Sequence, residues 1–194
     1  MVKIKHLQQI HDLKSYRNAC RVVKQLEPFI HETFHNKSKI IYLNKQGREL
    51  IGSANEVKKT PLIDHVLLTN EVYTSLDCPY DWKKEVHFEL EEKKQTDIEI
   101  KVLGAIKMSN KKKVIADATF TRNGYLNIVE IDNTRKMLDN KKKIEMYAEL
   151  FRLKKDCVMK LLFFTTTNDR KRKFEGWLQD YKIRGEVVVF DDLE

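Results

Sequence analysis

The feature that most constrains the fold of this chain is the dipeptide Asn123-Gly124, in the second half of the sequence. Asn-Gly favours the left-handed backbone of a two-residue hairpin turn, and alternating apolar and polar residues flank it on both sides. With these residues at the centre of the turn, the strands pair so that Asp117 lies opposite Glu130. Two acids are therefore expected to face each other across a sheet, with β-carbons about 5 Å apart.

Such an acid pair needs a compensating positive charge, because like charges directly across a strand pair are destabilising. Partial burial adds to the cost by raising the pKa of at least one carboxyl group. A divalent cation, Mg²⁺ or Mn²⁺, held by Asp117 and Glu130 would relieve the repulsion and could assist phosphodiester cleavage. A lysine from the nearby segment "KKKIEMY" would relieve it too, and the residues alone leave both alternatives open.

The rest of the second half predicts a mixed sheet with flanking helices, which is an α/β fold. Strands are expected at 82–92, 112–122, 124–132, 158–167 and 186–191, with helices at 62–76, 136–151 and 168–181. The segment 93–105 fits either a strand or a loop. The polar, turn-rich segment 52–61 is the expected linker, so we predict two domains, 1–52 and 60–194.

The first domain has the element order of a winged helix-turn-helix. Ser15 is a good N-cap for a helix whose apolar residues recur at helical spacing, and a short helix precedes it. Residues 31–44 alternate like two strands about a turn, and a short helical piece follows. In that arrangement the second helix enters the major groove of DNA and the hairpin contacts the backbone.

Basic residues are concentrated in the same region. Residues 1–60 hold 12 Lys+Arg against 5 Asp+Glu, whereas the remaining residues hold 25 against 24. The expected DNA-binding residues are Tyr16, Arg17, Asn18, Arg21, Lys24, Lys37 and Lys39. The arginines and the asparagine suit base edges, and the lysines suit phosphates. The alternative is a small helical domain with a solvated basic face.

Composition points to a cytoplasmic protein. No apolar run approaches the roughly 20 residues that a membrane span needs, and residues 1–10 lack the apolar block of a secretory signal. The three cysteines are unpaired by spacing, which indicates free thiols in a reducing compartment.

The acid pattern resembles the PD-(D/E)XK, or restriction-endonuclease-like, superfamily, with core order α-β-β-β-α-β. Asp117 matches its first acid, and "EID" at 130–132 matches its Glu-x-Lys motif, except that Asp132 stands in the place of the lysine. In members whose lysine has migrated to the next helix, the corresponding residue here would be Lys143. The resemblance implies Asp117, Glu130, Asp132 and Lys143 as the site. Without the lysine at 132, metal binding can survive while cleavage is lost.

A longer resemblance, over about residues 7–180, is to the replication-relaxation family of plasmids and integrative elements. It lies in segments such as "YLNKQGRELIG", "DHVLLTNEVYTSL", "YLNIVEID" and "LLFFTTTNDRKRK". It implies a double-stranded DNA-binding protein, acting in replication, relaxation or mobilisation, with a degenerate nuclease-like domain. A homodimer and a replication or mobilisation partner protein are expected. An active Mg²⁺- or Mn²⁺-dependent nuclease and a transcriptional regulator are the alternatives.

Overall fold

The chain forms two compact units that combine helices with sheet. The computed structural model describes residues 1–54, 56, 62–90, 112–133 and 135–193. Unit 1 comprises residues 1–80 with 191–194, and unit 2 comprises residues 81–190. The mixed α/β class is as predicted. The division falls at residue 80, however, whereas the sequence predicts it at 52–60.

Unit 1 contains a small antiparallel sheet and four α-helices within the described residues. Its elements are β1 (Val2–Lys3), α1 (Ile4–Ile10), α2 (Tyr16–Gln25), the 3-10 helix η1 (Glu27–Phe29), β2 (Ile30–His35), β3 (Ser38–Leu43), α3 (Lys45–Leu50) and α4 (Ile63–Ser75). The strand order is β1-β3-β2. Two short helices followed by a hairpin therefore appear where the sequence predicts them.

Helix α2 begins at the expected cap but buries only part of the predicted apolar stripe of Ala19, Val22, Val23, Leu26 and Phe29: Ala19 and Val23 are buried, whereas Leu26 is 39% exposed. The Ser15 hydroxyl accepts a hydrogen bond from the Asn18 backbone N–H at 3.2 Å, which satisfies one of the open donors of the first turn. On one face of α2, Ala19 and Val23 are buried in a cluster with Ile4 and Ile41. One side of α2 is thus fixed to the core and the other is left to solvent.

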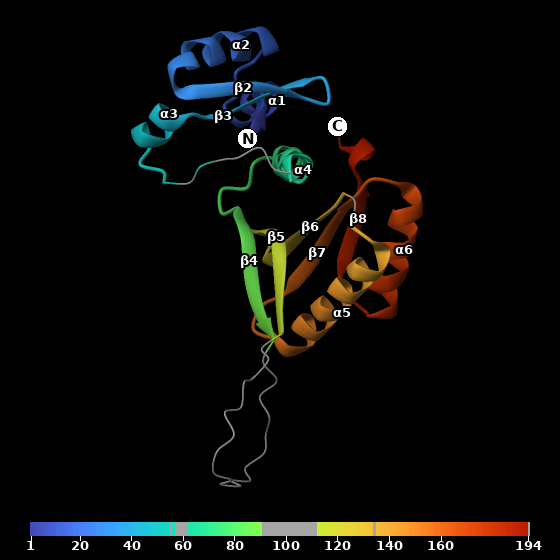
Figure 1. Ribbon diagram of the computed structural model, residues 1–194. Coiled ribbons are helices and arrows are strands. Elements are labelled where there is room, and N and C mark those ends of the chain that lie inside the picture. The colour runs from blue at the N-terminus through green and yellow to red at the C-terminus, as the bar shows by residue number, and fades with distance from the viewer. Residues whose placement is uncertain (55, 57–61, 91–111, 134, 194) are drawn as a thin grey trace, which may run out of the picture. The chain divides into compact units, whose positions relative to one another are not determined.

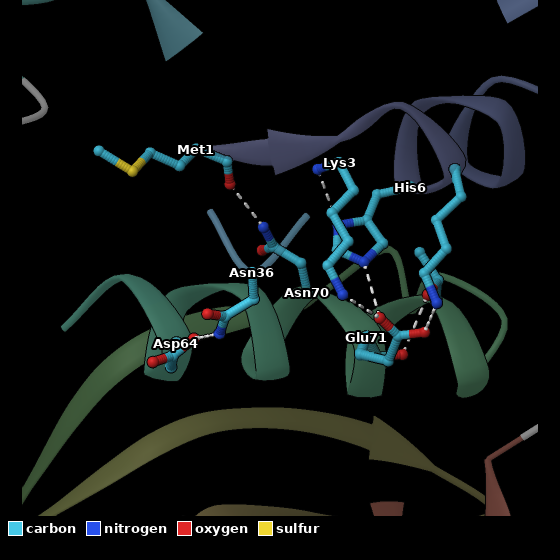
Figure 2. Close-up of polar contacts among 9 residues, drawn as sticks. Met1, Lys3, His6, Asn36, Asp64, Asn70 and Glu71 are labelled. Carbon is cyan, nitrogen blue, oxygen red and sulfur yellow. Dashed lines mark hydrogen bonds and ion pairs between the residues drawn. The ribbon is translucent and has the colours of Figure 1, made fainter. Parts of the chain in front are cut away.

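Helix α4 belongs to unit 1, although the sequence pattern assigns it to the second domain. Figure 2 shows its contacts with the start of the chain: Asn70 donates to the Met1 carbonyl at 2.8 Å, and Glu71 meets three basic side chains. His6 lies fully buried, and its Nε2 is 3.0 Å from Glu71 Oε2. Because His6 Nδ1 accepts from the Lys3 N–H, Nε2 is the nitrogen that donates to Glu71.

Unit 2 is built on a five-stranded mixed sheet. Its elements are β4 (Lys83–Leu90), β5 (Lys112–Arg122), β6 (Tyr125–Asp132), α5 (Met137–Leu153), β7 (Met159–Thr165), α6 (Asn168–Asp180) and β8 (Gly185–Val189). The 3-10 helix η2 (Phe190–Asp192) begins at the last residue of unit 2 and continues into the part of the chain assigned to unit 1. Strands β4, β5 and β6 are antiparallel, and β6, β7 and β8 are parallel. Helices α5 and α6 lie on one face of the sheet (Figure 1) and share one apolar core with it.

The predicted hairpin register is confirmed over the ladder that forms. Asn123 and Gly124 have φ values of 53° and 78°, as a two-residue hairpin turn requires. Pairing then runs from Arg122 opposite Tyr125 to Ala118 opposite Val129. The segment 93–105, predicted as a strand or a loop, lies outside the described residues. So do Thr60 and Pro61, which the sequence predicts as the cap and first residue of the helix at 62–76. Among the helices that are described, none combines the length and the hydropathy of a membrane span.

Candidate functional site

The sheet of unit 2 is interrupted at Asp117, on the level where the sequence predicts two opposed acids. The pair Glu85–Asp117 is missing from the β4–β5 ladder, although the pairs on both sides of it would place these residues opposite each other. The β5–β6 ladder ends at Ala118–Val129, one pair before Asp117 and Glu130 would meet. Glu85 has a φ of 52°, an uncommon conformation within a strand. The strands thus depart from regular pairing at this level.

The Asp117 side chain takes part in this interruption. Hydrogen-bonded pairs alternate along an antiparallel ladder, so the Ile131 N–H would regularly donate to the Ala116 carbonyl. Instead it donates to Asp117 Oδ2 at 2.6 Å. The carboxylate therefore replaces a backbone acceptor and is held at the edge of β6, beside Glu130.

Glu130 is enclosed and bound through both oxygens. It is 1% exposed, its Oε2 accepts from Lys143 Nζ at 2.5 Å, and its Oε1 accepts from the Tyr147 hydroxyl. The pKa of Glu130 is raised to about 7, because burial and the charge of Asp117 outweigh the opposing effects of Lys143 and Tyr147. The structure thus brings together Asp117, Glu130 and Lys143, all three of which the sequence singles out.

The arrangement does not fit a divalent metal as the side chains lie. Glu130 gives its two oxygens to Lys143 and Tyr147, and one oxygen of Asp117 is committed to Ile131. Over the described ranges, no three His, Cys, Asp or Glu side chains gather closely enough to hold a metal ion. The sequence allows a metal ion or a lysine as the positive charge beside the acid pair, and in the structure Lys143 is the cation that contacts Glu130.

Asp132 lies in a different network. Its carboxylate accepts from Arg170 Nε and Nη2, both at 2.6 Å, and from Asn140 Nδ2 and Thr165 Oγ1, both at 2.8 Å. The Asp132 side chain is fully buried, and Arg170 also donates to the Arg135 carbonyl at 2.7 Å. These bonds tie the ends of β6 and β7 to the starts of α5 and α6. Asp132 is therefore a structural anchor here and does not join the group around Glu130.

Two partners of these acids are not among the residues that the sequence singles out. Tyr147 could have been found, because it stands one helical turn after Lys143 and so shares its face of α5. Arg170 could not, since its contact with Asp132 spans 38 residues and depends on how α6 packs. A cavity of about 740 Å³ elsewhere in unit 2, lined mainly by α5 and the residues before β8, contains none of the predicted site residues.

The basic residues of α2 lie on its open face. Tyr16, Arg17, Arg21 and Lys24 are exposed, opposite the buried Ala19 and Val23. Asn18 is half-buried and engaged: its Nδ2 donates to the Leu13 carbonyl at 3.1 Å, and its Oδ1 accepts from Arg21 at 2.9 Å. Asn18 thus braces the turn before α2 and orients Arg21.

The hairpin lysines differ from each other. Lys37 is exposed at the turn, where Asn36 and Lys37 have φ values of 45° and 63°. Lys39 forms an ion pair with Glu32 at 2.6 Å, so part of its charge is already neutralised. Lys37 is the better placed of the two to meet a phosphate.

Comparison of this chain with protein-family models, with curated proteins and with solved structures finds no match.

Proposed function

We propose that this chain binds double-stranded DNA through unit 1 and acts in the replication, relaxation or mobilisation of a plasmid or integrative element, in the cytoplasm. The observation that carries the proposal is the open face of α2, where Arg17, Arg21 and Lys24 are exposed on a helix whose other face is buried. Unit 1 has the helix, helix and hairpin order of a winged helix-turn-helix. A homodimer on palindromic DNA, with a replication or mobilisation protein as partner, completes the proposal.

Unit 2 is proposed to be a nuclease-like domain that no longer cleaves. The order β4-β5-β6-α5-β7 follows the β-β-β-α-β part of the PD-(D/E)XK core, and the helix preceding it along the chain, α4, lies in unit 1. Asp117, Glu130 and Lys143 meet as that resemblance implies, but Lys143 and Tyr147 occupy the oxygens that a cation would need. We therefore propose that unit 2 serves docking or dimerisation.

The test of duplex binding distinguishes contacts with base edges from contacts with phosphates. Arg17→Ala and Arg21→Ala are expected to reduce the preference among DNA sequences, by about 1–3 kcal/mol for each arginine that reads a base. Lys37→Ala is expected to weaken all duplexes alike and to flatten the salt dependence of binding, with a smaller effect for Lys39→Ala because Glu32 already pairs with Lys39. Lys45→Ala, at an exposed position of α3, is the control. Equal losses on every sequence for all these variants would argue against readout by α2.

The alternative, an active Mg²⁺- or Mn²⁺-dependent nuclease, is favoured by the convergence of Asp117, Glu130 and Lys143. A nicking assay with each metal on supercoiled, linear and single-stranded DNA tests it, with Asp117→Ala as the comparison. Cleavage by the wild-type protein that Asp117→Ala abolishes would establish the enzyme and displace the docking proposal. A transcriptional regulator, the third hypothesis, would bind the same duplexes but leave replication of the element unaffected when the gene is removed.

A further inference from the structure

Beyond the basic face of α2, unit 1 exposes two aromatic rings near the place where the start of α2 approaches the β2–β3 hairpin. The first is Phe34 of β2, which is 72% exposed. Phe34 pairs with Lys39, and Ile41 follows Lys39 on the same side of β3. Ile41 is buried with Ala19 of α2. The side of the hairpin that carries Phe34 is therefore the side against which α2 packs, and Phe34 lies beyond the end of that contact, toward the hairpin turn.

The second ring is Tyr16, the first residue of α2, which is 54% exposed. Tyr16 stands one helical turn before Cys20, and Cys20 packs against the same core as Ile41. The pKa of Lys39 is raised chiefly by the hydrogen bond to Glu32 and by the charge of Glu32, against the effect of burial, with the smallest contributions from the nearby Cys20 and Tyr16 side chains. The start of α2 and the hairpin residue beside Phe34 are thus neighbours, in keeping with the course of α2 along the hairpin in Figure 1.

The surroundings of the two rings are cationic on balance. Arg17, in the first turn of α2, and Lys37, at the hairpin turn, are both exposed. Glu32 neutralises Lys39, and Asp64 is engaged by His35 at 2.6 Å and by Asn36 at 3.3 Å. Exposed aromatic rings beside basic side chains are the combination on which unpaired bases stack while their phosphates are held. Reading a paired duplex from the major groove relies mainly on donors and acceptors, with apolar contacts to thymine methyl groups, and does not require two exposed rings.

We propose that Tyr16 and Phe34 form a stacking site for bases of an unpaired DNA strand, next to the duplex that α2 holds. This inference rests on the proposed function and adds a second ligand to the same unit, namely single-stranded DNA that adjoins double-stranded DNA. A protein with both contacts would favour a junction where a duplex has been opened.

The test measures binding of the full-length protein to a blunt duplex and to the same duplex with a single-stranded tail, by fluorescence anisotropy at one fixed salt concentration. The wild-type protein is expected to bind the tailed duplex about tenfold more tightly, the magnitude for stacking of one or two bases. Phe34→Ala and Phe34→Leu should each remove most of this preference and leave binding to the blunt duplex unchanged. Phe34→Tyr retains the ring and should retain the preference.

A matched control and a second readout keep the outcomes distinct. Tyr80→Ala removes an aromatic ring of unit 1 that is 96% exposed and lies outside α2 and the hairpin, so it should change neither affinity. A 2-aminopurine base in the tail should lose fluorescence on binding to the wild-type protein but not to Phe34→Ala. Equal affinity of the wild-type protein for blunt and tailed DNA, or an unchanged preference in Phe34→Ala, would overturn the inference while leaving duplex binding intact. Failure to bind either DNA would overturn the proposed function as well.

Discussion

At the scale of single residues, the acids of unit 2 differ because their partners differ. Glu130 and Asp132 are two residues apart on β6, and both are 1% exposed. Asp132 has an arginine and two neutral donors, whereas Glu130 faces a lysine, a tyrosine and the charge of Asp117. The same side-chain chemistry thus yields a structural anchor at one position and a proton-binding group at the other.

The raised pKa of Glu130 makes stability depend on pH in a defined direction. Its pKa is about 7 in the folded protein and 4.5 for an ordinary glutamate, so the folded state holds a proton that the unfolded state releases between these values. The stabilising contribution of Glu130 is complete below about 4.5 and declines as the pH rises toward about 7. The difference in unfolding free energy between wild type and Glu130→Gln should therefore fall by about 3 kcal/mol over this range.

Urea denaturation across that pH range measures this difference. Glu186→Gln, which removes an exposed carboxylate of β8 that pairs with Lys160, is the matched control for removing an acid from unit 2. A pH-independent difference for Glu130→Gln would mean that Glu130 stays ionised through its pair with Lys143.

Asp132 is expected to matter for stability and to do so through Arg170. Asp132→Ala should lower the free energy of unfolding by about 3 kcal/mol, because it leaves the Arg170 guanidinium without its partner in a largely buried site. Arg170→Ala should cost a similar amount, and the double variant less than the two together. Asp132→Lys, which introduces the lysine that stands at this position in the resembling nucleases, should destabilise most, since it sets a second cation beside Arg170. Strictly additive losses in chemical denaturation would refute the coupling.

At the scale of elements, much could be predicted from sequence because the signals are local. The Asn-Gly turn sets the register from Arg122–Tyr125 to Ala118–Val129, and Ser15 sets the start of α2. The interruption at Asp117 could not be predicted, because a side chain there replaces a backbone acceptor. The assignment of α4 to unit 1 could not be predicted either, because it depends on contacts of Asn70 and Glu71 with residues more than sixty positions away in the sequence.

Helix α4 packs against the start of the chain and so adds to unit 1 a helix that residues 1–52 do not contain. The residues that unit 1 adds to 1–60 are acidic: residues 61–80 hold three acids and residues 191–194 hold three more, with no Lys or Arg in either segment. One of these acids, Glu71, is held by His6, Lys5 and Lys3 from the first helix and strand (Figure 2). The charge of Glu71 is thus neutralised inside unit 1, which leaves the face of α2 basic.

Glu71 is expected to stabilise unit 1 in a pH-dependent way. The hydrogen bond from His6 lowers the pKa of Glu71 to about 2, so its contribution is present above about 4.5 and is lost as the pH falls toward about 2. At neutral pH, Glu71→Gln should lower the free energy of unfolding by about 2 kcal/mol, less than the full shift implies because Glu71 is partly solvated. Glu49→Gln, an exposed acid of α3, is the control for denaturation. If Glu71→Gln costs as much unfolding free energy near pH 2 as at neutral pH, the packing of α4 against the start of the chain, and not the charge of Glu71, stabilises the unit.

At the scale of the whole molecule, both units present basic side chains, so the proposal that unit 1 binds DNA depends on a comparison of the two. Unit 2 carries Arg172 and Lys173 exposed on α6, so charge alone does not single out unit 1. The partners of the two arginines differ. Arg21 is oriented by the neutral Asn18, whereas Arg172 lies 3.8 Å from Asp169, an acid of its own helix that offsets its charge. A phosphate contact needs an unneutralised cation at a fixed position, which favours unit 1.

Two double variants that each remove two positive charges test this assignment. Arg17→Ala with Arg21→Ala should weaken duplex binding and make the plot of log affinity against log salt less steep, by about 0.9 for each phosphate that the protein no longer neutralises. Arg172→Ala with Lys173→Ala removes its two charges from unit 2 and should leave that slope unchanged. Because both pairs lie on exposed helix surfaces, neither double variant should alter the free energy of unfolding by more than about 0.5 kcal/mol per substitution. Equal changes of slope would show that DNA contacts both units, and a change confined to the unit 2 pair would transfer the DNA-binding surface from α2 to α6.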